Sequence, residues 1–240
     1  MRIGIITAMA QETLPLYEKM GGVVAESTIS GVRICKIEAG EHTLYLATSG
    51  VGEIRAALAV QLLKDLFDID ILLNFGFVGA LNPILAQGEL VLVKRTCHYQ
   101  FDTSRVDGTL VGQYPERKGL YFYLDGSLIE RVLSATGKQL RQVTCASGDV
   151  FVAVDEQKSM LKKQFGGDIC DMEVAGLAIA CERNRLPLLS VKVVSDSADG
   201  NAKDSFTSVV KKGLTRYEEL LPAILRAVTG DSSPLPPTRR

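Results

Sequence analysis

Residues 1–12 read MRIGIITAMAQE: an apolar run from Ile3 to Ala8 ends four residues before the carboxyl group of Glu12. A short apolar run of this kind is typical of a buried strand in a largely parallel sheet. Similar runs alternate with helix-like segments along the chain, so we predict an α/β sandwich with a central, mostly parallel or mixed β-sheet. Ligands of such sheets bind beyond the carboxyl ends of strands, which makes Glu12 a candidate functional residue.

The remaining elements follow from apolar periodicity and from the positions of glycine and proline. We predict strands at Ile3–Ala8, Val23–Thr28, Val32–Glu38, Thr43–Thr48, Ile69–Phe75, Glu89–Lys94, Gln142–Ala146, Asp168–Met172 and Pro187–Ser195. We predict helices at Glu12–Met20, Glu53–Phe67, Ser127–Gly137, Asp155–Phe165, Glu173–Asn184 and Phe206–Val228. Residues 23–48 suggest a meander, residues 76–80 a glycine-punctuated turn, and residues 97–126 a long loop. We expect residues 1–229 to form one domain and residues 230–240 to be a disordered tail.

Composition excludes several classes of protein. The 240 residues include 27 basic and 28 acidic side chains, which interleave, so we expect no nucleic-acid partner. Five cysteines without a C-x-x-C pair, and two histidines, argue against a disulfide framework or a metal site and favour a reducing, cytoplasmic location. We also expect no membrane association, because no apolar run approaches roughly 18 residues and the N-terminus does not resemble a secretory signal.

Acidic residues follow three of the predicted strands: Glu12, Glu173 and Asp196. Each has a simpler interpretation taken alone, since Glu12 and Glu173 suit the first turn of a helix and Asp196 suits a cap. If the strands run parallel, however, the three carboxyl groups meet at one edge of the sheet. Several carboxyl groups in one cleft suit acid–base chemistry on a neutral or cationic substrate.

Two further segments are candidate binding elements. In SGDVF, residues 147–151, Phe151 can stack on a planar heterocycle, although core packing is the commoner role of such a ring. Asp149 in the same segment is expected to serve a turn. Ser49–Gly52 begins a predicted helix and offers backbone N–H groups to an anion, although a lone glycine loop is a weak signal. We expect Cys170 and Cys181 to lie in the core.

Together these segments resemble the methylthioadenosine/S-adenosylhomocysteine nucleosidases, a family within the purine/uridine nucleoside phosphorylase superfamily. The resemblance extends from Met1 to about Val228 and rests on five motifs in order: IGIITAMAQE (3–12), SGVG (49–52), SGDVF (147–151), DMEVA (171–175) and VSDSAD (194–199). It implies an α/β fold of the nucleoside-phosphorylase type, a three-layer sandwich with a central mixed β-sheet flanked by helices. It also implies a homodimer and no cofactor. It also implies hydrolysis of the N-glycosidic bond of a purine nucleoside, 5′-methylthioadenosine and/or S-adenosylhomocysteine, to adenine and the free thioribose sugar.

The resemblance further implies catalytic roles for two residues. Glu12 would activate the attacking water, and Asp196 would protonate the purine at N7. The chemistry requires both groups, because a purine leaves poorly unless it is protonated and water attacks poorly unless a base accepts its proton. The implied substrate contacts are Met9 and Met172 on the sugar, Glu173 on the ribose hydroxyls, Phe151 stacked on the purine, the backbone of Val152 at the purine edge, and Phe77 and Ser195 elsewhere in the pocket.

The chain departs from the family pattern at three places. Phe77 stands where the family has a small or hydroxyl residue, so it either reshapes the ribose side of the pocket or packs into the core. Lys192 replaces the usual arginine, which binds carboxylates with a different geometry. Residues 97–104 match the family loosely, which leaves the 5′ substituent of the substrate open; Tyr99 and Phe101 are candidates to line that end of the site.

Three alternative functions remain open from the sequence. A purine nucleoside phosphorylase would need an anion pocket, usually with arginine, and the segment Met9–Glu12 contains none. A nucleosidase for another 5′-substituted purine nucleoside, such as futalosine, would differ in the 5′ group alone. A catalytically silent nucleoside-binding module would bind without turnover; the joint presence of Glu12, Glu173 and Asp196 argues against it.

Overall fold

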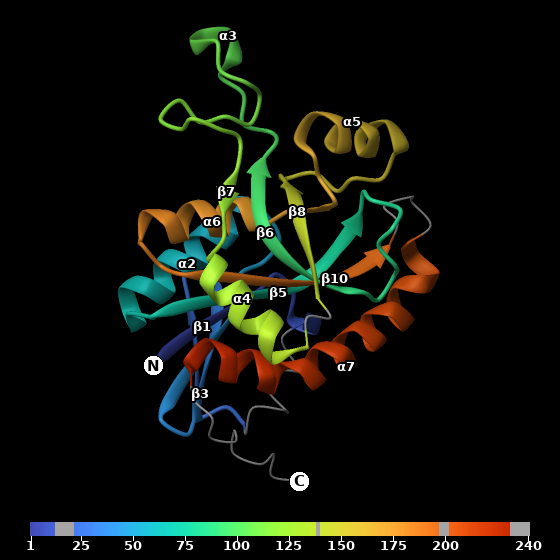
Figure 1. Cartoon of the computed structure of the whole chain (residues 1–240). Coiled ribbons are helices and arrows are strands. Elements are labelled where there is room, and N and C mark those ends of the chain that lie inside the picture. Colours follow the sequence, from blue (N-terminus) through green and yellow to red (C-terminus); the bar gives the residue numbers. More distant parts are fainter. Residues whose placement is uncertain (13–21, 138–139, 197–201, 231–240) are drawn as a thin grey trace.

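The computed structural model describes residues 1–12, 22–137, 140–196 and 202–230, and it leaves the side chains of residues 196 and 202–212 undescribed. Within these ranges the strands form one ten-stranded sheet (Figure 1). The strands are β1 (Arg2–Thr7), β2 (Ala25–Ile29), β3 (Val32–Ala39), β4 (His42–Thr48), β5 (Ile71–Ala80), β6 (Leu90–His98), β7 (Phe122–Tyr123), β8 (Arg141–Ser147), β9 (Ile169–Asp171) and β10 (Leu188–Asp196).

Helices cover both faces of this sheet. They are α2 (Glu53–Phe67), α3 (Ser104–Asp107), α4 (Gly126–Ala135), α5 (Asp155–Phe165), α6 (Val174–Arg183) and α7 (Ala202–Thr229). Helix α2 packs against α6 on one face, and α4 packs against α7 on the other (Figure 1). This arrangement confirms the predicted three-layer α/β sandwich. In the described part of the chain, no helix has the length and apolar character needed to cross a membrane.

The sheet is mixed, as predicted, and strand β5 lies at its centre. Strand β5 runs parallel to β1 and to β10 and antiparallel to β9. Through β10, β6, β8 and β9 the pairing returns to β5, so this part of the sheet closes on itself. Because β1, β5 and β10 run parallel, their carboxyl ends meet at one edge, where ligands of α/β sheets bind.

Several predicted elements are confirmed, and others differ from the prediction in their bounds. The β2–β3–β4 meander is present, with antiparallel pairing throughout. The turn predicted at Gly76–Ala80 is instead the second half of β5, because these residues pair with β10 and β9. Strand β6 extends to His98, and the loop predicted after it contains α3 and β7. Most of the predicted helix Glu12–Met20, and the tail at residues 231–240, lie outside the described residues.

Candidate active site

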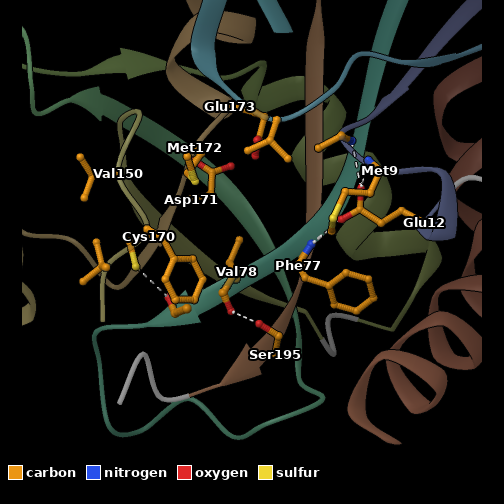
Figure 2. A pocket seen from close by; sticks show the side chains of 15 residues that line it. Met9, Glu12, Phe77, Val78, Val150, Cys170, Asp171, Met172, Glu173 and Ser195 are labelled. Atoms are coloured by element: carbon orange, nitrogen blue, oxygen red, sulfur yellow. Dashed lines mark hydrogen bonds between the residues drawn. The ribbon is translucent and has the colours of Figure 1, made fainter. Parts of the chain in front are cut away.

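A cavity of about 250 Å³ opens beyond the carboxyl ends of the central strands (Figure 2). It gathers predicted site residues from five separate segments of the chain, namely Met9, Glu12, Phe77, Phe151, Val152, Met172, Glu173 and Ser195. Other lining residues include Val51, Cys170 and Asp171. Asp196 is the last residue of β10 and pairs with Gly79 of the lining strand β5 across a register shift. The side chain of Asp196, like residues 197–199, lies outside the description.

Glu12 is buried in the cavity wall, with 2% of its surface exposed. Its Oε2 accepts hydrogen bonds from the backbone N–H groups of Ala8 (2.9 Å) and Met9 (2.8 Å), and its Oε1 accepts a longer one from Phe77 (3.4 Å; Figure 2). Burial raises the pKa of Glu12, while these N–H groups and the positive charge of Lys192 oppose the rise. The carboxyl group is therefore held at both oxygens by donors, in an environment that makes it a stronger base than an exposed glutamate.

Glu173 approaches the cavity from the start of α6. Its Oε1 accepts a hydrogen bond of 3.1 Å from the backbone N–H of Gly52, at the start of α2. The anion-binding capacity of the Ser49–Gly52 loop is thus used, at least in part, by a carboxyl group of the same chain. Burial, followed by the nearby charge of Asp171, raises the pKa of Glu173 to about 7. Although β9 runs antiparallel to β5, Glu173 still reaches the same cavity as Glu12.

Phe77 makes both of the contacts that the sequence left as alternatives. Its side chain lines the cavity beside Glu12 (Figure 2). It also packs against the core, with its ring 5.9 Å from Phe75 in an edge-on arrangement. Phe75 in turn stacks on Tyr217 of α7 at 3.8 Å. The ring at position 77 therefore places apolar surface at the Glu12 side of the cavity and is supported from behind by two further aromatic rings.

The opposite wall is formed by the segment after β8. Phe151 lines the cavity yet is 63% exposed, so its ring lies at the open side of the site, whereas Val152 is buried. Asp149, expected in a turn, accepts a hydrogen bond of 2.8 Å from the backbone N–H of Glu53 and so caps α2 from a distant segment. On the β10 side, the hydroxyl of Ser195 donates to the carbonyl of Val78 at 3.2 Å.

Comparison with known proteins identifies the family of this chain. The family model described as the phosphorylase superfamily matches residues 2–229. The 5′-methylthioadenosine/S-adenosylhomocysteine nucleosidase of Buchnera aphidicola (subspecies Acyrthosiphon pisum, strain Tuc7) is 31% identical over 232 residues, which cover 92% of this chain and 97% of that relative. The chain belongs to this nucleosidase family of the phosphorylase superfamily. The predicted resemblance is confirmed.

Solved structures of nucleosidases have the same fold. The Helicobacter pylori 5′-methylthioadenosine/S-adenosylhomocysteine nucleosidase is 26% identical with a TM-score of 0.88, covering 93% of this chain and 97% of that one. The futalosine hydrolase of H. pylori strain 26695 gives the same identity, TM-score and coverage. The nucleosidase of Streptococcus pneumoniae, solved with a transition-state inhibitor, is 28% identical with a TM-score of 0.86, covering 95% and 100%. Overall shape therefore does not separate the two nucleosidase substrates.

In this nucleosidase, sequence reasoning missed a buried ion pair at the base of the cavity. Nζ of Lys192 lies 2.9 Å from Oδ2 of Asp171, and both side chains are almost completely buried. Burial alone would raise the pKa of Asp171, but Lys192 and the hydroxyl of Ser147 hold it below its ordinary value. A Cβ added at Gly76 would lie 3.4 Å from both Lys192 Nζ and Glu12 Oε1, so the ammonium group also approaches the proposed base.

The sequence also gave no role to Glu53, which opens α2. An acid in the first helical turn is normally a solvent-exposed dipole partner, but Glu53 is 5% exposed. Its Oε1 contacts the hydroxyl of Ser147 (2.5 Å), and its Oε2 accepts from the backbone N–H of Gly176. Glu53 directly follows the SGVG motif and Ser147 begins the SGDVF motif, but no local pattern links the two residues.

Proposed function

We propose that this chain hydrolyses the N-glycosidic bond of 5′-methylthioadenosine and/or S-adenosylhomocysteine, releasing adenine and the free thioribose sugar. The observation that carries the proposal is Glu12: a buried carboxyl group in the cavity of a nucleosidase-family protein, held by backbone donors and facing the space left for substrate. That arrangement suits a base that accepts a proton from water.

In the proposed reaction the water oxygen attacks C1′ of the sugar while the bond from C1′ to N9 of the purine breaks. Glu12 accepts a proton from the water, and Asp196 donates a proton to N7, so that adenine leaves as a neutral molecule. The sugar passes through an oxocarbenium-like state, as in glycoside hydrolysis. Asp196→Asn is expected nearly to abolish turnover while ligand binding remains, and full activity in that variant would remove Asp196 from the mechanism.

The other predicted residues supply substrate contacts in this proposal. Glu173 accepts hydrogen bonds from the ribose hydroxyls, and Met9 and Met172 pack on the sugar. Phe151 stacks on the purine at the open side of the cavity, while the backbone of Val152 contacts the purine edge. The location of these residues on one cavity supports the assignment.

Hydrolysis is favoured over phosphorolysis by what lines the site. A phosphorylase needs cationic or strong hydrogen-bond donors for phosphate beside the sugar. Among the described lining residues there is no arginine or lysine, and Phe77 places an aromatic ring near Glu12. Lys192 lies beneath the cavity, but its ammonium group is already paired with Asp171.

The test is to incubate the protein with methylthioadenosine, S-adenosylhomocysteine, futalosine, adenosine and inosine, each with and without phosphate, and to separate the products. Release of base and free sugar without phosphate is expected, with the two thio-substituted nucleosides ranked first. Futalosine ranked first would assign the activity of the H. pylori futalosine hydrolase neighbour instead. A sugar 1-phosphate formed when phosphate is present would make the protein a phosphorylase.

We also propose a homodimer, a single catalytic domain over residues 1–229 and a cytoplasmic location. Exposed apolar side chains support the dimer: Ile54 and Leu58 lie one turn apart on α2, and Val51 and Phe151 lie beside the cavity. Covering such side chains removes apolar surface from water. Sedimentation at micromolar concentration tests this, since a monomeric mass would exclude the dimer.

A further inference from the structure

The hydroxyl group of Ser147 lies between two carboxyl groups. Its Oγ is 2.5 Å from Oε1 of Glu53 and 2.6 Å from Oδ1 of Asp171, and it accepts a hydrogen bond of 3.1 Å from the backbone N–H of Ala175. A serine hydroxyl carries a single hydrogen atom. It therefore donates to one carboxyl group, and the other carboxyl group must itself supply the hydrogen atom of the second contact.

Asp171 is the carboxyl group that accepts. Its Oδ1 also lies 3.3 Å from the Cys145 thiol and 3.3 Å from the backbone N–H of Val174, both of which are donors. Its Oδ2 faces the ammonium group of Lys192. Donors and a cation on both oxygens favour the ionised form. Ser147 therefore donates its hydrogen to Asp171, and the proton between Ser147 and Glu53 belongs to Glu53.

The surroundings of Glu53 agree with a protonated group. Its described hydrogen-bond partners are the Ser147 hydroxyl and the N–H of Gly176. The ionisable groups around it are mostly acidic: Asp171 at the end of β9, Glu173 before α6, Asp149 after β8, and Tyr99 and Tyr114 after β6. The basic group among them is Lys192, which pairs with Asp171. Burial first, and then the charge of Asp171, raise the pKa of Glu53 to about 8.

We propose that Glu53 acts as a buried carboxylic acid that donates to Ser147 and thereby positions Asp171 and Lys192 beneath the substrate cavity. Glu53 is a positioning residue, because it lies behind Asp171 and does not line the cavity. The order of donation is Glu53 to Ser147 to Asp171, and the ammonium group of Lys192 forms an ion pair with Asp171 from the other side. The protonation state of Glu53 does not depend on the proposed function, whereas its effect on turnover rests on it.

Loss of this proton would change the charge balance of the site. The positive charge of Lys192 opposes the rise that burial causes in the pKa of Glu12 and of Glu173. An ionised Glu53 would place a second carboxylate 2.5 Å from Ser147, so that Ser147 could satisfy one of the two anions and not both. The hydrogen bond that fixes Asp171 would then weaken, and with it the position of Lys192 beside Glu12. We expect turnover to fall as pH rises through the pKa of Glu53.

Glu53→Gln tests the proposal, because glutamine has the shape of a protonated glutamate. The N–H of Gly176 requires an oxygen on its side, so the amide NH₂ faces Ser147 and donates as the acid does. We expect kcat/KM within about threefold of wild type at neutral pH and a weaker fall above pH 8. Glu53→Ala, which removes the donor, is expected to lose about tenfold or more by misplacing groups at the site. Equal losses in the two variants, at matched folding by circular dichroism, would overturn the proposal.

Infrared spectroscopy supplies a readout that requires no substrate. The wild-type minus Glu53→Gln difference spectrum at neutral pH is expected to contain the C=O stretching band of a protonated carboxylic acid, shifted in D₂O. The band should disappear as pH rises above about 8. A difference spectrum that contains a carboxylate band instead would show that Glu53 is ionised. Because no turnover is measured, this result stands even if the proposed reaction fails.

Discussion

Glu12 and Glu53 are both buried glutamates near the same cavity, and burial raises the pKa of both, yet their hydrogen-bond partners differ. Both of Glu12's oxygens accept backbone N–H groups, and the charge of Lys192 reaches it. Glu53 accepts one backbone N–H, contacts a hydroxyl group whose only hydrogen is donated to Asp171, and faces the negative charge of Asp171. Burial therefore does not by itself decide what a carboxyl group does. The number of donors around it, and the sign of the nearest charge, separate a base from a donor.

Glu12→Gln is the change with the largest expected effect on this comparison. An amide cannot accept a proton from water, and its NH₂ group would face a backbone N–H on one side or the other. We expect kcat for adenine release to fall by on the order of 10²–10⁴-fold, whereas Glu53→Gln keeps its activity. Product separation by chromatography measures both. Comparable activity in the two glutamine variants would mean that water is activated elsewhere.

Lys192→Met removes the cation that Asp171 and Glu12 share. It leaves Asp171 as a buried charge without its partner, so we expect a loss of about 3–5 kcal/mol in the free energy of unfolding. Urea denaturation followed by circular dichroism gives this value. Lys94→Met is the matched control, because Lys94 is exposed and such changes usually stay within about 0.5 kcal/mol. A Lys192→Met variant as stable as this control would contradict the ion pair.

Gly176→Ala tests the contact at the oxygen of Glu53 that accepts a hydrogen bond. A Cβ at position 176 would lie within 2.3 Å of the backbone oxygen of Glu53, so α2 and α6 would have to move apart. We expect a destabilisation of about 1–3 kcal/mol, as for other overpacked sites, measured as a shift in the urea midpoint. Gly126→Ala is the control, since a Cβ there meets no atom within 4 Å. Equal midpoints in the two variants would show that the helices are not in close contact.

The most gradual expected effect is a pH dependence of stability, which is small over any single pH unit. The pKa of Glu53 is raised in the folded state to about 8, from an ordinary value of 4.5. Its contribution to stability is therefore fully present below about pH 4.5 and is lost as pH rises to about 8. Relative to Glu53→Gln, the wild type should lose stability with pH by at most about 1.4 kcal/mol per unit. Urea midpoints across this range measure the difference, with exposed Glu130→Gln as the control. Parallel curves for wild type and Glu53→Gln would refute a raised pKa.

Local sequence patterns predicted most of the elements. Helices α2 and α5 have the predicted bounds, because their apolar spacing and flanking residues are local signals. Strand β5 was predicted too short, since Gly76 and Gly79 resemble turn residues in sequence. In the structure Gly76 instead makes room for Glu12 and Lys192, a requirement set by β10, more than 100 residues further along the chain.

The residues of the candidate site also divide into those that local sequence patterns predicted and those that depend on distant contacts. Residues that lie in short motifs, such as Glu12, Phe151 and Glu173, were found because each motif is contiguous, and the structure places them on one cavity. Glu53 was missed because its partner Ser147 is 94 residues away. A first-turn glutamate has the same local sequence whether it faces solvent or a distant serine. Only the packing of α2 against α6 and β8 separates these cases.

The cysteines of this chain have a practical consequence. All five are buried, and burial raises the pKa of Cys97 to about 12 and those of Cys145 and Cys181 as well. Thiols of this kind react slowly with alkylating reagents until the surrounding structure opens. Cys170 differs because it lines the cavity. Alkylation followed by mass spectrometry therefore reads two quantities in one experiment: the rate of local unfolding at the core thiols, and the occupancy of the cavity at Cys170.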